Sequence, residues 1–401
     1  MAHPSLHHAA AGHREPFRLL FPLGLTYVTV ALALWLIASI DPRWMPPGRA
    51  HMGLVVIGFF GCFATGFLMT MLPRLLQTAP IHRAWSLLAT LIALVGLGWL
   101  LFPGGAAPTG ILAAAFGVLL ISFAAWHVPH GRQLPPPRMA LAGVGLLGGC
   151  VAAITTTLPV ALPPWLTGTT NAILTQGLMV MLIAAIAGHL LPRFARQQVI
   201  AAPGTIGPHA YLRFALMGII LLASYASQQF AIFHGDGFTG YGVRASILVR
   251  SILLTILLAP ALILHGKQSA WIRVAQLSLW CIVLGSWCAV GWPAYHLAWS
   301  HLIFVPGFLL LTLVIAARVV TAHSGRPELL DGDRWWITIM ALLIIVGAAS
   351  RIGAEWSWRT RELHLVLGAI FALLGIAVWL LRFGRLLLPR SQRTLQPERG
   401  C

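Results

Sequence analysis

Charged residues are scarce in this chain of 401 residues. Only 9% are Asp, Glu, Lys or Arg, and 58% are apolar, whereas soluble domains have about 25% charged residues. So few charges cannot cover a water-facing surface. Together with a mean hydropathy of +0.85, this scarcity excludes an ordinary soluble protein and indicates an integral membrane protein.

Several motifs are also missing. The five cysteines form no CxxC pair: Cys62, Cys150, Cys281, Cys288 and Cys401. Neither a disulfide framework nor a zinc ribbon is therefore indicated. A phosphate-binding loop, a dinucleotide fingerprint, a hydrolase nucleophile elbow and an HExxH zinc motif are absent as well. Because residues 1–16 are polar and rich in histidine, we expect a polar tail there and no secretory signal peptide.

What the chain does contain is long apolar runs of about 18–25 residues, each able to cross a hydrocarbon core near 30 Å. They cover 17–40, 51–76, 84–102, 108–128, 139–158, 168–192, 209–232, 245–265, 271–291, 296–321, 335–352 and 363–387. The sequence predicts an all-α, polytopic helix bundle of about twelve transmembrane helices. It forms one membrane domain, 17–388, between a His-rich tail, 1–16, and a basic tail, 389–401.

The basic residues set the expected orientation. The formal net charge of +17 could indicate nucleic acid, but Lys and Arg sit at span ends rather than on a soluble face. With twelve spans, nineteen of the 26 basic residues fall on the side of the termini and seven on the other. The positive-inside rule then predicts cytoplasmic termini in a multi-pass inner-membrane protein. We expect a lipid bilayer as partner and no nucleic acid.

Polar side chains gather on the opposite, outer side. They are His51, Ser224, Tyr225, Gln228, Gln229, His234, Arg250, His296, His301, Arg351, Glu355 and His364. Ionisable groups inside spans are costly and usually face a bundle interior or a water-filled cavity, so this gathering predicts a site. A single histidine there is more often an interfacial anchor than a ligand, and Arg351 has the alternative of snorkelling to the headgroups. The inner-side histidines fall mostly in turns, where we expect them to be solvated.

Two details narrow the candidates. Arg250 lies about six residues into its span and needs an anionic partner, which is either Glu355 or a carboxylate on a bound cofactor such as a haem propionate. His296 and His301 are five residues apart, about 140° around a regular helix, so both face one metal only if the helix is irregular. His301 is the preferred ligand because it lies deeper.

Span two carries a stripe of small, polar and sulfur-bearing residues. Gly58, Cys62, Thr65 and Met69 fall on the same helical face as His51. Soft sulfur ligands suit copper(I), but core packing is the preferred interpretation of Met69. Cys62 lies about 16 Å below His51 on a regular helix, too deep to share one metal with it.

Four segments resemble the NnrS family of bacterial twelve-span membrane proteins. They are EPFRLLFPLG, HMGLVVIGFFGCFATGFLMTMLPRLL, GHLLPRFAR and HLIFVPGFLLLTLVIAARVVTAHSGRP. The most specific feature is the spacing from His301 through Arg318 to His323 and the following Gly-Arg-Pro. The resemblance implies haem and copper as cofactors, and a role in nitric oxide tolerance with nitric oxide or a related small molecule as partner.

The sequence also departs from the family pattern. Gly53 and Leu54 stand where the second segment usually has a further histidine and a glutamate. His189 stands at a usual arginine, and Gln276 at a histidine of the ninth span. Because these positions include expected metal ligands, the departures weaken the expectation of copper more than the expectation of haem.

The resulting hypothesis is a haem-binding membrane protein of nitrogen-oxide stress. His51 and His301, which match family histidines, are the expected axial ligands, and Arg250 and Arg351 are expected to neutralise propionates. His296 and His364 are second candidates for metal ligation or for support of the ligands. The alternative is a transporter or metal-handling carrier without redox activity, for which two related halves of six spans would be typical. Turnover of a substrate, gas scavenging and electron transfer all stay open.

Overall fold

The computed structural model describes residues 15–41, 48–101, 107–195, 207–332 and 334–388, and this part of the chain contains helices and no strand. The elements in order are α1 (Phe17–Ile40), α2 (Gly48–Met52), η1 (Gly53–Phe59), α3 (Phe60–Leu76), α4 (Arg83–Leu101), α5 (Ala107–His127), α6 (Met139–Thr157), α7 (Pro164–Ala172), η2 (Ile173–Gly177), α8 (Leu178–Phe194), α9 (Pro208–Ala231), η3 (Ile232–Asp236), α10 (Tyr241–Leu262), α11 (Ala270–Gly291), η4 (Pro293–Tyr295), α12 (His296–Leu302), η5 (Ile303–Leu309), α13 (Leu310–His323), α14 (Glu328–Asp331), α15 (Arg334–Gly353), α16 (Arg361–Phe383) and η6 (Gly384–Leu386).

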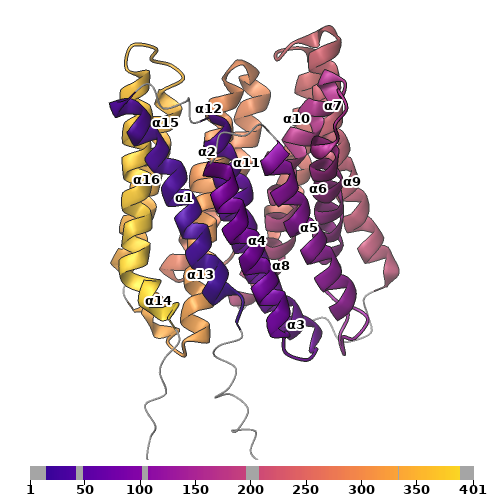
Figure 1. Cartoon of the computed structure of the whole chain (residues 1–401), viewed down its shortest axis with the longest axis vertical. Helices are drawn as coiled ribbons and strands as arrows, with labels where there is room; N and C mark the ends of the chain where they lie inside the picture. The colour runs from indigo at the N-terminus through magenta and orange to yellow at the C-terminus, as the bar shows by residue number, and fades with distance from the viewer. Residues whose placement is uncertain (1–14, 42–47, 102–106, 196–206, 333, 389–401) are drawn as a thin grey trace, which may run out of the picture.

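The long helices run roughly parallel in one bundle (Figure 1). Twelve segments of the described chain are long and apolar enough to cross a membrane: Phe17–Ile40, Ala50–Leu76, Arg83–Leu101, Thr109–His127, Met139–Thr157, Pro164–Phe194, Pro208–Asp236, Tyr241–Leu262, Ala270–Gly291, Pro293–His323, Arg334–Gly353 and Arg361–Leu386. We number them spans 1–12. The predicted all-α membrane bundle is confirmed, with span boundaries mostly within a few residues of the expected ones.

The first and last spans meet at one end of the bundle. There the Arg18 guanidinium donates a hydrogen bond of 2.8 Å from Nη1 to the carbonyl oxygen of Leu386. A chain that crosses the membrane an even number of times must begin and end at the same end of the bundle. Most of the predicted tails, residues 1–14 and 389–401, lie outside the described residues, and the cytoplasmic side of the termini stays a prediction. We call this end the Glu15 end and the opposite one the His51 end.

Three spans form the centre of the bundle. In spans 2, 6 and 10, 72%, 61% and 67% of the most apolar window is buried, whereas no other span exceeds 50%. The three are spaced four spans apart, and each is interrupted by a π-helical segment, η1, η2 or η5. The most buried spans and these three π-helical segments therefore recur every four spans.

Small residues let span 2 reach this central position. Gly58 faces span 1, and a Cβ atom there would lie 2.0 Å from the Tyr27 ring. Tyr27 is fully buried, and its hydroxyl donates a 2.7 Å hydrogen bond to the carbonyl oxygen of Ala93 in span 3. Cys62 and Met69 are fully buried as well. The predicted stripe is thus a packing surface toward partner helices.

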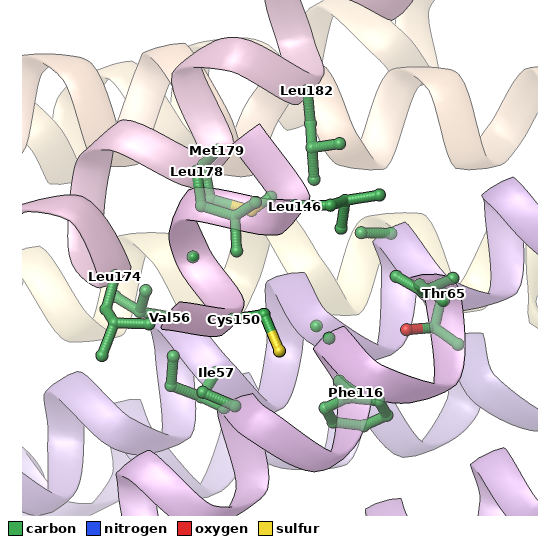
Figure 2. A pocket seen from close by; sticks show the side chains of 16 residues that line it. Val56, Ile57, Thr65, Phe116, Leu146, Cys150, Leu174, Leu178, Met179 and Leu182 are labelled. Carbon is green, nitrogen blue, oxygen red and sulfur yellow. The ribbon is translucent and has the colours of Figure 1, made fainter. Parts of the chain in front are cut away.

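The bundle also contains a small, partly open apolar cavity (Figure 2). It has a volume of about 40 Å³ and lies between η1 and α3 of span 2, α5, α6, and η2 and α8 of span 6. None of the residues that line it is exposed. The cavity is separate from the polar residues of the His51 end.

Candidate functional site

His51 is held by the first span. Its Nδ1 atom lies 3.0 Å from the carbonyl oxygen of Ala31 and 3.2 Å from the indole nitrogen of Trp35. A neutral imidazole makes one of these bonds at a time, because Nδ1 either donates to the carbonyl or accepts from the indole. Donation to Ala31 leaves the lone pair on Nε2, the tautomer that a metal ligand requires.

His301 is oriented in the same way on the central span 10. Its Nδ1 atom lies 2.8 Å from the carbonyl oxygen of Leu297, one turn earlier in the same helix. Among the described residues, neither Nε2 of His301 nor Nε2 of His51 has a hydrogen bond. Two imidazoles with Nδ1 on a backbone carbonyl and a free Nε2 are a donor set suited to metal coordination.

The two histidines lie within electrostatic range of each other. His301 is near enough to His51 for their charges to interact, and Arg351 of span 11 interacts electrostatically with both. Arg351 also donates a 2.8 Å hydrogen bond from Nη1 to the Glu355 carboxylate, and both side chains are mostly buried. The His51 end of spans 1, 2, 10 and 11 therefore combines two potential ligands with a charged group beside them.

Spans 2 and 10 contact each other closely only on the Glu15 side of the two histidines, not at the level of the histidines themselves. The Phe60 and Phe308 rings meet edge to face with their centroids 5.8 Å apart, and α3 packs against α13 toward the Glu15 end. No comparable contact joins α2 to α12 in the described chain. The histidine-bearing segments are thus held by other helices, α1 for His51 and α15 for His301.

A helical irregularity follows each histidine. The π-helical segments η1 and η5 begin two residues after His51 and His301. Such segments rotate the side chains that precede them relative to the rest of the helix and are frequent at functional sites. In span 6, η2 begins two residues after Asn171, so Asn171 occupies the position that a histidine occupies in the other two central spans.

Arg250 belongs to a different part of the His51 end. Its helix α10 packs against α8, α9 and α11 and lies on the opposite side of the bundle from α15 in Figure 1. Arg250 is 6% exposed. It donates a 2.6 Å hydrogen bond to the Gln228 side chain, and its guanidinium carbon lies 4.0 Å from the Tyr225 ring centroid.

The anionic partner expected for Arg250 is not Glu355, because Glu355 pairs with Arg351. Nη1 of Arg250 and the hydroxyl of Tyr225 are both buried, and neither has a hydrogen-bond partner in the part of the chain that the structure describes. A buried guanidinium without an acidic neighbour is costly in a membrane interior. The remaining expectation for Arg250, a carboxylate on a bound group, stays a prediction.

His296 and His364, the second candidates for metal ligation, do not contact His51 or His301 in the described chain. His296 is exposed and stacks on Phe238, with the ring centroids 4.9 Å apart and an interplanar angle of 3°. His364 lies against span 11, where its Nδ1 is 3.3 Å from the Ser350 hydroxyl. No contact of the described residues joins either histidine to His51 or His301, so their assignment as ligands also stays a prediction.

Potential metal donors do not occur in larger groups. Across the described ranges, no three His, Cys, Asp or Glu side chains come together in a way that could hold a metal ion. Cys62, Cys150 and Cys281 are free and buried.

The comparison with known families decides the classification. A model of the NnrS protein family matches residues 12–390, almost the whole chain. The chain belongs to the NnrS family. The resemblance inferred from the sequence is thereby confirmed, whereas no curated protein is similar enough to the chain to count as a match.

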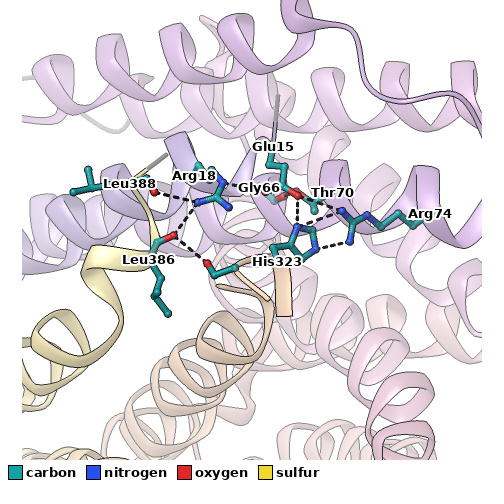
Figure 3. A network of polar contacts seen from close by, with 9 residues as sticks. Glu15, Arg18, Gly66, Thr70, Arg74, His323, Leu386 and Leu388 are labelled. Carbon is teal, nitrogen blue, oxygen red and sulfur yellow. Dashed lines mark hydrogen bonds and ion pairs between the residues drawn. The ribbon is translucent and has the colours of Figure 1, made fainter. Parts of the chain in front are cut away.

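The segment that carried the most specific NnrS resemblance forms a polar cluster at the Glu15 end (Figure 3). His323 contacts the Glu15 carboxylate through Nδ1, and Nη1 of Arg74 lies 2.7 Å from its Nε2. Glu15 also forms ion pairs with Arg18 at 3.0 Å and Arg74 at 3.2 Å. The cluster ties the start of span 1 to the ends of spans 2 and 10.

The expectation that the inner-side histidines are solvated is wrong for three of them: the His323 side chain is 9% exposed, and His127 and His189 are each only 5% exposed. It is confirmed for His82, His130, His209 and His265, which are exposed. Glu15 was missed as a structural residue, although it is one of only nine acidic residues and stands at the start of a span. That scarcity is the signal that could have identified it.

Replacement of Glu15 by glutamine is expected to lower the stability of the bundle by about 1–3 kcal/mol, because three cationic or hydrogen-bonding partners lose their carboxylate. Burial alone would raise the pKa of Glu15, but the hydrogen bond and charge of His323, with Arg18, outweigh it and hold the pKa below its ordinary value of 4.5. A depressed folded pKa stabilises the protein above about pH 4.5, and the benefit is lost as the pH falls through the folded pKa.

Thermal denaturation of the wild type and Glu15→Gln in detergent, from pH 7 to pH 3, measures this effect. The difference in melting temperature should be constant above about pH 4.5 and shrink below it. A difference that grows on acidification would refute the stabilising role assigned to the carboxylate.

Proposed function

We propose that this NnrS chain is a haem-binding protein of the inner membrane that contributes to tolerance of nitric oxide or related nitrogen oxides. His51 and His301, one from each of two central spans, would hold its iron. The observation that carries the proposal is that both imidazoles have Nδ1 on a backbone carbonyl and Nε2 free, and that they lie near each other. The proposed site is on the outer side, with the termini in the cytoplasm.

The arginines complete the proposed site. Arg351 interacts with both histidines and is placed to neutralise a propionate, while Glu355 fixes its guanidinium. Arg250, which contacts Gln228 and Tyr225 but no acidic side chain among the described residues, is proposed to bind a second carboxylate. A bound haem would supply a redox-active iron whose potential depends on its axial ligands and surroundings.

Within this site, the chain's own residues orient the ligands and tune them. Donation from Nδ1 to Ala31 and to Leu297 fixes the two imidazoles in the ligand tautomer and raises their basicity. The Trp35 ring meets the His51 ring at 5.7 Å and shields one side of it. Copper is not part of the proposal as a required cofactor, because Gly53 and Gln276 stand where the family segments usually have histidines.

The visible spectrum and haem content of the purified protein test the proposal. A Soret band with about one haem per chain is expected, and metal analysis of the same sample should find iron in that ratio without a matching amount of copper. A folded but colourless preparation, obtained from cells able to make haem, would contradict the proposal and favour the alternative of a carrier without redox activity.

A further inference from the structure

The apolar cavity beside span 2 has features that packing alone does not explain. Its volume of about 40 Å³ is roughly three times the 10–15 Å³ that one water molecule needs on the same measure. Voids of this size are few in well-packed interiors. Small residues leave the space open, among them Gly61, Ala64, Ala113 and Gly117.

The hydroxyl of Thr65 is the unusual group on its wall. Thr65 is fully buried, and its Oγ1 has no hydrogen-bond partner among the described residues. Other threonines inside spans donate to the carbonyl four residues earlier, as Thr70 of the same helix does to Gly66 at 2.7 Å and Thr255 of span 8 does to Ser251 at 2.8 Å. The Thr65 hydroxyl instead stays unpaired beside the cavity (Figure 2).

The remaining wall decides what the cavity can hold. Apart from Thr65 and the thiol of Cys150, its lining side chains are hydrocarbon or thioether. A buried water usually makes about three hydrogen bonds to polar groups, which this wall does not offer. An ion would be excluded by the cost of desolvation. A neutral molecule of low polarity with one weak acceptor atom matches both the apolar wall and the single donor.

We propose that this cavity is a binding site for a diatomic gas, dissolved from the surrounding hydrocarbon, with the Thr65 hydroxyl donating a hydrogen bond to it. The site is formed by spans 2, 4, 5 and 6 and needs no prosthetic group. It therefore stands or falls independently of the haem proposal. Its position against η1, the segment that follows His51, places the stored gas next to the span that carries one of the proposed ligands.

Xenon is the first probe, because dry apolar cavities of proteins bind it. Crystals of the wild type under xenon pressure should show an anomalous peak between Thr65 and Cys150. Ala64→Leu places three more carbon atoms in the cavity and should abolish the peak, while Ala113→Val is a milder filling variant with the same expected result. Ala125→Leu, the same change at an exposed position of α5, should retain it. No peak in the wild type, or an unchanged peak in a filled variant, would overturn the site.

Carbon monoxide tests the role of the hydroxyl. The infrared stretching band of carbon monoxide held in the cavity should differ from the band of the gas dissolved in detergent micelles, because of the hydrogen bond from Thr65. Thr65→Val has nearly the same shape and should keep the xenon peak while the infrared band moves to its apolar position. An identical band in the wild type and Thr65→Val would refute the assigned hydrogen bond.

Thr65→Val should also stabilise the protein, whereas most substitutions of a buried residue destabilise it. Thr65→Val removes a buried hydroxyl that has no partner in the absence of gas, so the melting temperature in degassed buffer should rise. Thr70→Val is the matched control on the same helix: it deletes a hydrogen bond that is made and should lower the melting temperature. A fall for Thr65→Val equal to that for Thr70→Val would show that the Thr65 hydroxyl is partnered after all.

Discussion

Purified His51→Ala and His301→Ala are each expected to lose at least about nine-tenths of the bound haem. Loss of a residue that merely supports a metal ligand weakens metal binding about 10–100-fold, and loss of the ligand itself should cost no less. Both histidines are on central spans, but each is only partly buried. The bundle should therefore fold in both variants. Haem content per folded chain, measured as the pyridine haemochrome, checks the result.

His296→Ala and His364→Ala are the matched controls. Each removes an imidazole from the same end of the bundle, but His296 stacks on Phe238 and His364 contacts Ser350. Haem content should stay within about a factor of two of the wild type in both, because an indirect effect on the ligands is the most that either can have. Haem loss confined to His296→Ala or His364→Ala would reassign the ligands.

Gly58→Ala is expected to destabilise the protein by about 1–3 kcal/mol or more, the usual range for overpacking. The added Cβ would lie 2.0 Å from one carbon of the Tyr27 ring and 2.4 Å from another. The ring cannot swing away freely, because it is fully buried and its hydroxyl bonds to Ala93. Spans 1 and 2 must then separate, which also disturbs the contact between Ala31 and His51.

Gly98→Ala is the control for this substitution. Gly98 is also in a transmembrane helix, but a Cβ atom there would meet nothing within 4 Å. Alanine should be neutral or stabilising at this position, since it favours a helix by up to about 1 kcal/mol over glycine. Melting temperatures of the two variants in one detergent, with haem content measured alongside, separate packing from propensity. Equal melting temperatures for the two variants would contradict the packing role of Gly58.

The twelve spans could be predicted from the sequence because each is a long apolar run bounded by Pro, Gly or Arg. The length of an apolar run is a property of the local sequence, and it does not depend on which helices become neighbours in the fold. The gathering of His51, His301 and Arg351 at one end followed from counting the spans and assigning alternate sides. The even count also predicted that the first and last spans share an end, as the bond from Arg18 to Leu386 shows.

Partner choice could not be predicted, because it depends on which helices are neighbours. Glu355 and Arg250 are both near one end of the bundle, yet spans 8 and 11 do not bring them together, and Glu355 pairs with Arg351 in its own span. The sequence likewise did not show which spans lie at the centre of the bundle. Spans 2, 6 and 10 are no more apolar as a group than spans 8 and 12, and their burial distinguishes them from every other span. A π-helical segment alone does not, because span 7 ends in one, η3.

The electron paramagnetic resonance spectrum of the oxidised wild-type protein tests the central claim most directly. Coordination of one haem iron by His51 and His301 predicts a low-spin ferric signal typical of two imidazole ligands, lost in His51→Ala and in His301→Ala and kept in His296→Ala. A high-spin ferric signal in the wild type, or a low-spin signal that survives both alanine substitutions, would contradict it.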